Sequence, residues 1–333
     1  MKRAPTLSVI MPARNAEETI LAAVSSVLES TFDDFEFIIV DDGSTDQTWG
    51  MIQNLRDPRL RPYSNPEPGL CRALNLAVSR CRGSFIARMD ADDISDRHRF
   101  ECQLAAIRDH GWDVAGGLVR IVNRANQPVP SYQRYQSWIN ANRDDASIRA
   151  HRFVESPLAN PTTVARREVY EIPFREGPFP EDYEFWLEAM RRPFVFGKVN
   201  EVVLDWIDSP HRTTRRDPRY SPQGFDTCRR KHLLLGPLHQ QRTIDLWGAG
   251  QTGKPWLRWW RMRGGTVRGL IDVSPKKIGQ RIHEVQVRSP EALRPPDGIP
   301  LVVAVGAPRA REEIESFLRK LGYRIGENVW FVA

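Results

Sequence analysis

The sequence predicts an α/β protein with a doubly wound mixed sheet, followed by a small half domain of the same class. Strand and helix patterns alternate with short connections over residues 7–89, which is typical of parallel strands covered by helices on both faces. Polar and acidic residues follow three of these strands. A second run of strand, glycine-rich turn and helix begins at Thr243.

The first alternation predicts seven elements. Its strands are expected at residues 7–11, 35–40, 59–63 and 84–89, and its helices at 17–28, 47–55 and 70–80. The carboxyl ends of parallel strands meet at one edge of a sheet, and ligands bind there. We therefore expect the residues that follow three strands to lie together: 12–15, 41–44 and 90–93.

The pattern is less regular between residues 115 and 240. Strands are predicted at 117–122, 162–166, 194–197 and 202–206, with a helix at 182–191. Residues 211–241 are expected to be a linker with one helix at 224–235. A chain of 333 residues suits two domains, which we predict at residues 1–240 and 242–333.

The composition limits the class of protein. A hydrophobic content of 41% and a charged content of 27% are ordinary for a folded, soluble chain. No stretch approaches the ~18–20 apolar residues of a membrane-spanning helix, and we expect no signal peptide because residues 1–6 lead directly into a strand. The four cysteines show no metal-ligand spacing, which favours free thiols in a reducing cytoplasm.

The positive charge is unevenly distributed. Residues 1–241 hold 32 Lys+Arg and 33 Asp+Glu, whereas residues 242–333 hold 16 and 9. The basic character therefore belongs to the C-terminal part. Since no aromatic–basic RNA motif or DNA-reading helix is recognisable, we expect no nucleic-acid partner.

Three carboxylates, those of Asp90, Asp92 and Asp93, directly follow the strand at residues 84–89. Like charges this close repel, and Mg²⁺ or Mn²⁺ would remove that cost because both ions prefer oxygen ligands. The structural alternative is a solvated acidic turn or the cap of the next helix.

Two further acidic clusters have a functional and a structural interpretation. In residues 40–46, the Asp42 carboxylate is suited to accept a hydrogen bond from a nucleotide base or ribose, or else it stabilises a turn before the next helix. In residues 180–187, Glu181 and Asp182 favour the helix dipole. Alternatively, one of them is a general base that takes the proton from an attacking hydroxyl, a single displacement that inverts configuration.

These segments together resemble glycosyltransferase family 2, whose members adopt the GT-A fold. The resemblance covers about residues 5–210 and consists of motifs in the family's order. They are the opening strand and nucleotide loop (7–15), the uridine-contacting turn (40–46), the helix before the metal strand (68–75), the metal strand (87–93) with Arg97, Arg99, Phe100 and Gln103, and the acceptor-side acidic motif (180–187).

The resemblance implies roles for single residues. Asp42 would contact the base, Asp90 would bind the sugar or ribose side of the donor, and Asp182 would be the general base. Asp92 or Asp93 would bind the metal.

The remaining donor-side residues are implied less directly. Pro12, Arg14 and Asn15 belong to the nucleotide loop, while Arg72 and Arg88 are candidates for diphosphate contact or for ordinary ion pairs.

His211 is the candidate for a histidine that helps to bind the metal and diphosphate in many members, the alternative being an exposed histidine in a basic linker. The aromatic–arginine pair usual upstream of that histidine is Asp205-Trp206 here, a departure from the family.

The C-terminal part contains a complete G-x-G-x-x-G turn, formed by Gly248, Gly250 and Gly253, between a strand and a helix. A second strand at 267–271 ends at Asp272, and a third strand at 301–306 precedes a helix at 308–321. This is the context of a dinucleotide-binding fingerprint, and it predicts a Rossmann-like half domain that binds a dinucleotide or nucleotide, or keeps only the scaffold. About 90 residues leave no room for the substrate domain of a dehydrogenase.

Residues 254–263 mix basic and aromatic side chains. They fit contact with an anionic membrane surface, where lipid-linked acceptors reside. The alternative is that Leu257, Trp260 and another aromatic residue pack on the sheet while the arginines are solvated.

We therefore predict an inverting, metal-dependent glycosyltransferase in the cytoplasm or at the inner face of the membrane. It would move a sugar from a nucleotide-sugar, a UDP-sugar, to a glycan, lipid-linked or small-molecule acceptor. The alternative is a non-catalytic, nucleotide-sensing scaffold that works through the C-terminal part.

Overall fold

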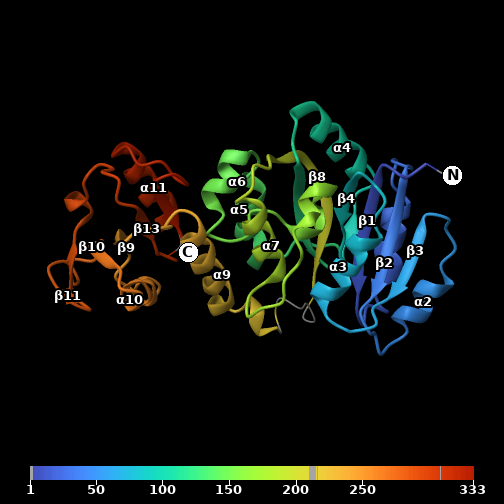
Figure 1. The fold of residues 1–333 in the computed structure, drawn as a ribbon, viewed down its shortest axis with the longest axis horizontal. Coiled ribbons are helices and arrows are strands. Elements are labelled where there is room, and N and C mark those ends of the chain that lie inside the picture. The colour runs from blue at the N-terminus through green and yellow to red at the C-terminus, as the bar shows by residue number, and fades with distance from the viewer. Residues whose placement is uncertain (1–2, 210–214, 216, 308) are drawn as a thin grey trace. The chain divides into compact units, whose positions relative to one another are not determined.

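The computed structural model describes residues 3–209, 215, 217–307 and 309–333 (Figure 1). The contacts of the chain divide it into two compact units. The first comprises Met1–Ile148 and Pro157–Phe225, and the second comprises Arg149–Ser156 and Asp226–Ala333. The predicted boundary near residue 240 concerns domains that fold independently, and it stays a prediction.

An eight-stranded mixed sheet forms the centre of the first unit, in the order β3-β2-β1-β4-β7-β6-β8-β5. The strand β1 is parallel to both β2 and β4, whereas β7 is antiparallel to β4 and β6. This confirms the predicted fold class. The strands are β1 (Leu7–Ala13), β2 (Phe35–Asp41), β3 (Leu60–Ser64), β4 (Phe85–Arg88), β5 (Ile94–Ser95), β6 (Val114–Asn123), β7 (Val164–Arg166) and β8 (Phe196–Asp208).

Helices cover both faces of this sheet because the buried strands are apolar on both sides (Figure 1). The helices α1 (Ile20–Leu28), α2 (Thr48–Asn54) and α4 (Arg99–His110) share one core cluster with alternate residues of β1. The helices α3 (Leu70–Arg80) and α7 (Glu181–Ala189) share the other. Further helices of the chain are α5 (Gln133–Ala141), α6 (Asp145–His151) and α9 (Pro222–Leu235).

One local prediction was wrong, and one helix was expected only as an alternative and without bounds. The strands predicted at 194–197 and 202–206 form the single strand β8, because three exposed residues in its middle interrupt the apolar pattern. The helix α4 was expected only as the helix that the acids at 90–93 would cap, without bounds, since its inward face carries the fully buried polar residues Arg99 and Gln103. Neither feature matches the apolar period on which the prediction rests.

The second unit has a six-stranded sheet in the order β11-β12-β10-β9-β13-β14. The central strand β9 is parallel to β10 and β13, and only β11 among the described strands of this sheet runs antiparallel to its neighbour. The elements are β9 (Thr243–Trp247), α10 (Gly253–Met262), β10 (Thr266–Ile271), β11 (Arg281–Ile282), β12 (Val285–Arg288), β13 (Leu301–Val303), α11 (Ala310–Lys320) and β14 (Val329–Phe331).

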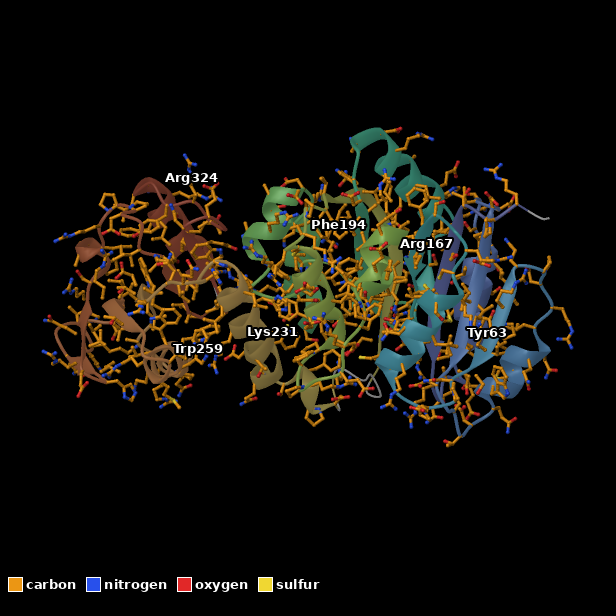
Figure 2. All side chains as sticks on the ribbon, viewed as in Figure 1. Tyr63, Arg167, Phe194, Lys231, Trp259 and Arg324 are labelled. Atoms are coloured by element: carbon orange, nitrogen blue, oxygen red, sulfur yellow. The ribbon has the colours of Figure 1, made fainter. Side chains whose placement is uncertain are left out.

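The aromatic residues of α10 pack mainly inward. Trp256, Leu257 and Trp260 are buried, as the packing interpretation of residues 254–263 predicts. Trp259, labelled in Figure 2, is half-buried, and the guanidinium groups of Arg230 and Arg263 lie 5.5 and 6.0 Å from the centre of its ring. The tryptophans of this helix are therefore largely shielded from solvent.

Candidate functional site

The pairing of three strands brings the predicted loops to one edge of the first sheet. Since β1 lies between β2 and β4 and is parallel to both, the residues that follow these strands emerge on the same side. The Asp42 amide donates to the carbonyl of Ala13 (2.8 Å), and the Met89 amide donates to that of Ile10 (3.0 Å). The expected proximity of residues 12–15, 41–44 and 90–93 follows from this pairing.

The Asp42 carboxylate is buried and held in a fixed orientation beside a cavity of about 570 Å³. Its Oδ1 accepts hydrogen bonds from Asn65 Nδ2 and from the Gly69 amide, both at 2.7 Å. The turn around it is stabilised by other acids, because Asp41 accepts from the Ser44 amide and Asp46 accepts from the Thr48 amide. Asp41 and Asp46 therefore stabilise the turn itself, whereas Asp42 holds Asn65 and Gly69 and borders the cavity.

The residues of the predicted nucleotide loop differ in their placement. Pro12 is buried within β1, and Arg14 is exposed and lines the cavity. Asn15 joins two loops, because its amide donates to Ser44 Oγ (3.0 Å) and its Oδ1 accepts from the Thr45 amide (2.8 Å). Asn15 thus stabilises the loop that carries Arg14.

The three acids after β4 form a compact cluster. Asp90, Asp92 and Asp93 offer carboxylate oxygens that all lie within 4.8 Å of one another. Asp93 is fully buried and accepts a hydrogen bond from the Ile207 amide (2.9 Å). Oxygen atoms gathered in this way are the donor set that a hard divalent cation prefers.

Arg88 is part of this cluster. Its guanidinium forms an ion pair with Asp90 (2.5 Å) and donates to the Met89 carbonyl. The side chain is buried, so the structure supports the ion-pair interpretation of Arg88.

A buried polar network supports the acidic cluster from within the protein. Arg99 Nη2 donates to the carbonyls of Arg88 (2.8 Å) and Thr163 (3.3 Å), and Gln103 Nε2 donates to those of Ala115 and Thr162 (both 2.7 Å). Burial lowers the pKa of Arg99 to about 9. The helix α4 thereby fixes the end of β4, a function that the sequence analysis did not assign to these side chains.

The two acids at the start of α7 lie in different environments. Glu181 is buried, with Oε1 accepting from Tyr220 Oη (2.8 Å) and Oε2 facing Arg219 Nη1 (3.5 Å). Burial raises the pKa of Glu181. Asp182 is half-buried, and its Oδ1 accepts from the Tyr183 amide (2.7 Å). Glu181 is therefore held inside the fold by Tyr220 and Arg219, and the assignment of Asp182 as the base stays a prediction.

The loop before α7 is held by a residue that the sequence analysis did not single out. Asn75 Nδ2 donates to the Phe174 carbonyl, and the Phe174 amide donates to Asn75 Oδ1, both at 2.9 Å. This loop continues to Glu176, which lines the cavity and lies 3.5 Å from Arg72. Arg72 is also 3.9 Å from Glu67. It therefore forms ordinary ion pairs, which was the alternative to diphosphate contact.

The predicted histidine and the two residues expected upstream of it lie at or beyond the end of β8 in the sequence. His211 lies outside the described residues. Asp205 and Trp206 stand where the family usually has an aromatic–arginine pair. Asp205 forms an ion pair with Arg120 (2.6 Å), and the Trp206 ring lies 6.0 Å from that of Tyr135. These two residues stabilise neighbouring elements.

The glycine-rich turn of the second unit contains glycines of two kinds. A Cβ on Gly248 would lie 2.4 Å from the Ala304 carbonyl oxygen, and one on Gly253 would lie 1.7 Å from that of Gly248. A Cβ on Gly250 would meet nothing closer than Lys277 Nζ, at 3.6 Å. The fold itself requires Gly248 and Gly253, whereas Gly250 leaves its side of the turn open.

The carboxylate of Asp272, at the end of β10, accepts hydrogen bonds from groups within the second unit. Asp272 Oδ2 accepts from the Ala249 amide (2.9 Å) and from Lys277 Nζ (3.0 Å), and Oδ1 accepts from the Ser274 amide (2.8 Å). It therefore ties the glycine turn to the following loop.

Comparison with known proteins identifies a family and several relatives. The model of the family described as glycosyl transferase family 2 matches residues 8–172. The chain is 35% identical over 233 residues to the UDP-Glc:alpha-D-GlcNAc-diphosphoundecaprenol beta-1,3-glucosyltransferase WfgD of Escherichia coli, covering 69% of this chain and 85% of the relative. It is 32% identical over 201 residues to an uncharacterized glycosyltransferase of Haemophilus influenzae, covering 57% and 62%.

The fold is also similar to a solved structure. S. aureus TarS 1-349 in complex with UDP-GlcNAc matches with a TM-score of 0.56 and 21% identity, covering 69% of this chain and 66% of that chain. None of the helices in the described ranges has both the length and the apolar character needed to cross a bilayer.

Proposed function

The chain belongs to glycosyl transferase family 2, and from this premise we propose that it is an inverting, metal-dependent transferase that uses a UDP-sugar as donor. The observation that carries the proposal is the single sheet edge in the first unit. There the Asp42 carboxylate, at the end of β2, lines a cavity. The cluster of Asp90, Asp92 and Asp93 follows β4, and both strands pair with β1.

The cavity supports a nucleotide-binding role. Asn65 and Gly69 donate to Oδ1 of Asp42, which holds its carboxylate ready to accept an N–H or O–H from the base or ribose. Arg14 adds a cationic side chain to the cavity wall, suited to the phosphate oxygens. We assign the nucleoside of the donor to this cavity.

The acidic cluster fits a divalent cation. Asp92 and Asp93 would hold it, with Asp90 facing the sugar or ribose side and His211 as the candidate fourth group. When bound, Mg²⁺ or Mn²⁺ would neutralise the charge that develops on the diphosphate leaving group. Arg88 holds Asp90 in place through their ion pair.

We assign proton transfer to Asp182. Its carboxylate would take the proton from the acceptor hydroxyl as that oxygen attacks the anomeric carbon, while the bond from that carbon to the diphosphate breaks. One displacement leaves the new glycosidic bond with inverted configuration. Burial of the neighbouring Glu181 and its contact with Tyr220 support this division of roles.

We propose a glycan or lipid-linked acceptor at an anionic membrane surface. The Escherichia coli relative carries the name of an enzyme that acts on a diphosphoundecaprenol acceptor. The second unit supplies charge for such a surface, with 21 Lys+Arg against 11 Asp+Glu, and on α10 the apolar side chain of Met262 is 87% exposed.

The second unit supports an alternative function. We propose that it is Rossmann-like, and the open side of Gly250 beside Lys277 would suit the phosphates of a dinucleotide or nucleotide. A non-catalytic, nucleotide-sensing scaffold would work through this turn alone. The internal contacts of Asp272 weigh against its use for a ribose.

A panel of nucleotide-sugars tests the proposal. The purified full chain should slowly release nucleoside diphosphate from its own donor when Mg²⁺ or Mn²⁺ is present. This release should stop when the metal is chelated. A scaffold would release none from any donor in the panel, and that result would refute the transferase.

A further inference from the structure

The sequence Asp-Pro-Arg occurs twice in the first unit, with the same local structure. In Asp57-Pro58-Arg59, the aspartate accepts from the Arg59 amide (2.9 Å), Nε (3.0 Å) and Nη2 (3.0 Å). In Asp217-Pro218-Arg219, the aspartate accepts from the Arg219 amide (2.9 Å), Nε (2.9 Å) and Nη2 (2.6 Å). Each triplet is therefore a tight turn in which the arginine closes back on the aspartate.

The two turns differ in what surrounds the arginine. The Arg59 guanidinium also donates to the Leu28 carbonyl (3.0 Å) and lies over the ring of Phe35, so it is used within the fold. Asp217 and Arg219 instead line the cavity that Asp42 borders. The second turn thus presents a carboxylate and a guanidinium to the proposed donor.

The paired groups retain hydrogen-bonding capacity beyond their contacts with each other and with Glu181. A guanidinium has five N–H groups, and the contacts of Arg219 among the described residues use three of them, two on Asp217 and one on Glu181. Asp217 Oδ1 accepts only from the Arg219 amide within the described part of the chain. Donors and an acceptor therefore lie side by side.

The charge of this pair indicates which chemistry it suits. Two carboxylates, those of Asp217 and Glu181, lie against the Arg219 guanidinium at 2.6 and 3.5 Å and offset its positive charge. A guanidinium whose charge is balanced by neighbouring carboxylates attracts a phosphate less than an unpaired arginine does. Adjacent hydroxyls, each of which both donates and accepts, match a neighbouring carboxylate and guanidinium.

We propose that Asp217 and Arg219 recognise a pair of adjacent hydroxyl groups on the donor, from its ribose or its transferred sugar. This inference rests on the proposed function, because it takes the cavity as the donor site. It makes the second Asp-Pro-Arg turn a specificity-determining element, while the first is purely structural. The ion pair with Glu181 fixes Arg219 to the start of α7.

Binding of three ligands to the full chain tests the proposal. The ligands are UDP, 2′,3′-dideoxy-UDP and the UDP-sugar that the wild type hydrolyses best, each titrated with Mg²⁺ in a calorimeter. The variants are Asp217→Asn and Arg219→Gln, and the matched controls are Asp57→Asn and Arg59→Gln in the first turn. Because Asp217→Asn keeps the size of the side chain, it remains informative if Arg219→Gln does not fold.

Each source of the hydroxyls gives its own result. If the ribose is recognised, both cavity variants bind UDP about tenfold more weakly and bind dideoxy-UDP as the wild type does, a loss typical of a hydrogen bond to a charged group. If the transferred sugar is recognised, UDP binds normally and the UDP-sugar loses about tenfold. The control variants bind all three ligands as the wild type does.

Two results would overturn the inference while the wild type still binds UDP. One is unchanged affinity of the cavity variants for all three ligands. The other is an equal loss for all three, dideoxy-UDP included, which would mean that the turn acts on the shape of the cavity. If the wild type itself binds no UDP, the proposed function fails first and the inference fails with it.

Discussion

The acids of the candidate site differ in which donors occupy their oxygens. Asp41 and Asp46 accept from amides of the turn after β2, whereas Asp42 accepts from Asn65 and Gly69 and lines the cavity. Glu181 is buried against Tyr220, whereas its neighbour Asp182 is half-buried. Neighbouring carboxylates thus receive separate roles from their surroundings.

The first prediction concerns the general base. Asp182→Asn should lower transfer at least about 100-fold, because the amide cannot take the proton of the acceptor, while the affinity for UDP stays within about twofold of the wild type. Steady-state transfer and calorimetry check the two parts. Glu181→Gln is the control, since a buried structural acid should affect folding stability more than transfer. Full transfer by Asp182→Asn would contradict the assignment.

Motifs predicted which residues gather at the sheet edge, but they did not predict what each side chain contacts. The turn at residues 40–46 contains three aspartates of equal type, and only their hydrogen bonds distinguish Asp42 from the other two. Asn75 was missed because its partner, Phe174, lies 99 residues away in the chain. Contacts between distant segments leave no local signal.

At the scale of elements, Asn75 connects α3 to the loop before α7 through two hydrogen bonds. Asn75→Ala leaves two backbone groups of Phe174 without their partner, and it should lower the free energy of unfolding by about 1–3 kcal/mol. Urea denaturation measures this. Ser79→Ala, on the exposed side of the same helix, should change stability by less than about 0.5 kcal/mol. Equal effects would contradict the role of Asn75.

The start of β8 gives a pH-dependent prediction. Burial, with a smaller contribution from Arg143, lowers the pKa of Lys198 to about 7, and its ammonium donates to the Ile139 carbonyl at the end of α5. An unfolded lysine keeps its proton to about pH 10.4. Between pH 7 and pH 10 the unfolded chain therefore holds a proton that the folded chain has released.

The free energy of unfolding should consequently rise with pH across that window by about 1 kcal/mol per pH unit more in the wild type than in Lys198→Met. Chemical denaturation at several pH values measures both slopes. Parallel slopes for the two proteins would show that Lys198 does not titrate in this range.

The elements themselves were predicted where the pattern of apolar residues matches a helix or strand period. The helix α3 was predicted with its observed bounds, Leu70–Arg80. The bounds of α4 were not predicted, because Arg99 and Gln103 point inward to hold backbone carbonyls of other elements. Its buried polar side chains stabilise the site at the expense of the local apolar pattern.

At the scale of the whole molecule, the two units carry opposite charge. The first has 27 Lys+Arg and 31 Asp+Glu, and the second has 21 and 11. If the second unit meets an anionic surface, the full chain should float with vesicles that contain about 30% anionic lipid, and 0.5 M salt should release it because salt screens this attraction.

Met262 provides a specific variant for that test. Met262→Asp places a negative charge on the exposed side of α10 and should reduce the bound fraction several-fold. Leu21→Asp, at an apolar side chain that is 46% exposed in the first unit, is the matched control and should bind as the wild type does. No flotation of the wild type, or an equal loss in both variants, would contradict membrane contact through the second unit.

The division of the chain shows what a linear sequence cannot predict. The contacts place Arg149–Ser156 with the second unit and begin the main part of that unit at Asp226, while the boundary near residue 240 stays a prediction about domains that fold independently. Within that unit, Arg229 donates to the Val154 carbonyl. A segment that joins a distant part of the chain has no signature in composition.

The central claim is that the sheet edge of the first unit, and not the glycine turn of the second, performs the chemistry. Metal-dependent release of UDP from the best donor should be measured for the wild type, Asp92→Asn and Gly250→Val in the full chain. A Cβ at residue 250 would meet nothing closer than Lys277 Nζ, at 3.6 Å, so a side chain there changes the turn that the alternative function would use. We predict that Asp92→Asn loses at least about 100-fold in rate while Gly250→Val keeps the wild-type rate. Loss of activity in Gly250→Val with full activity in Asp92→Asn would contradict the claim.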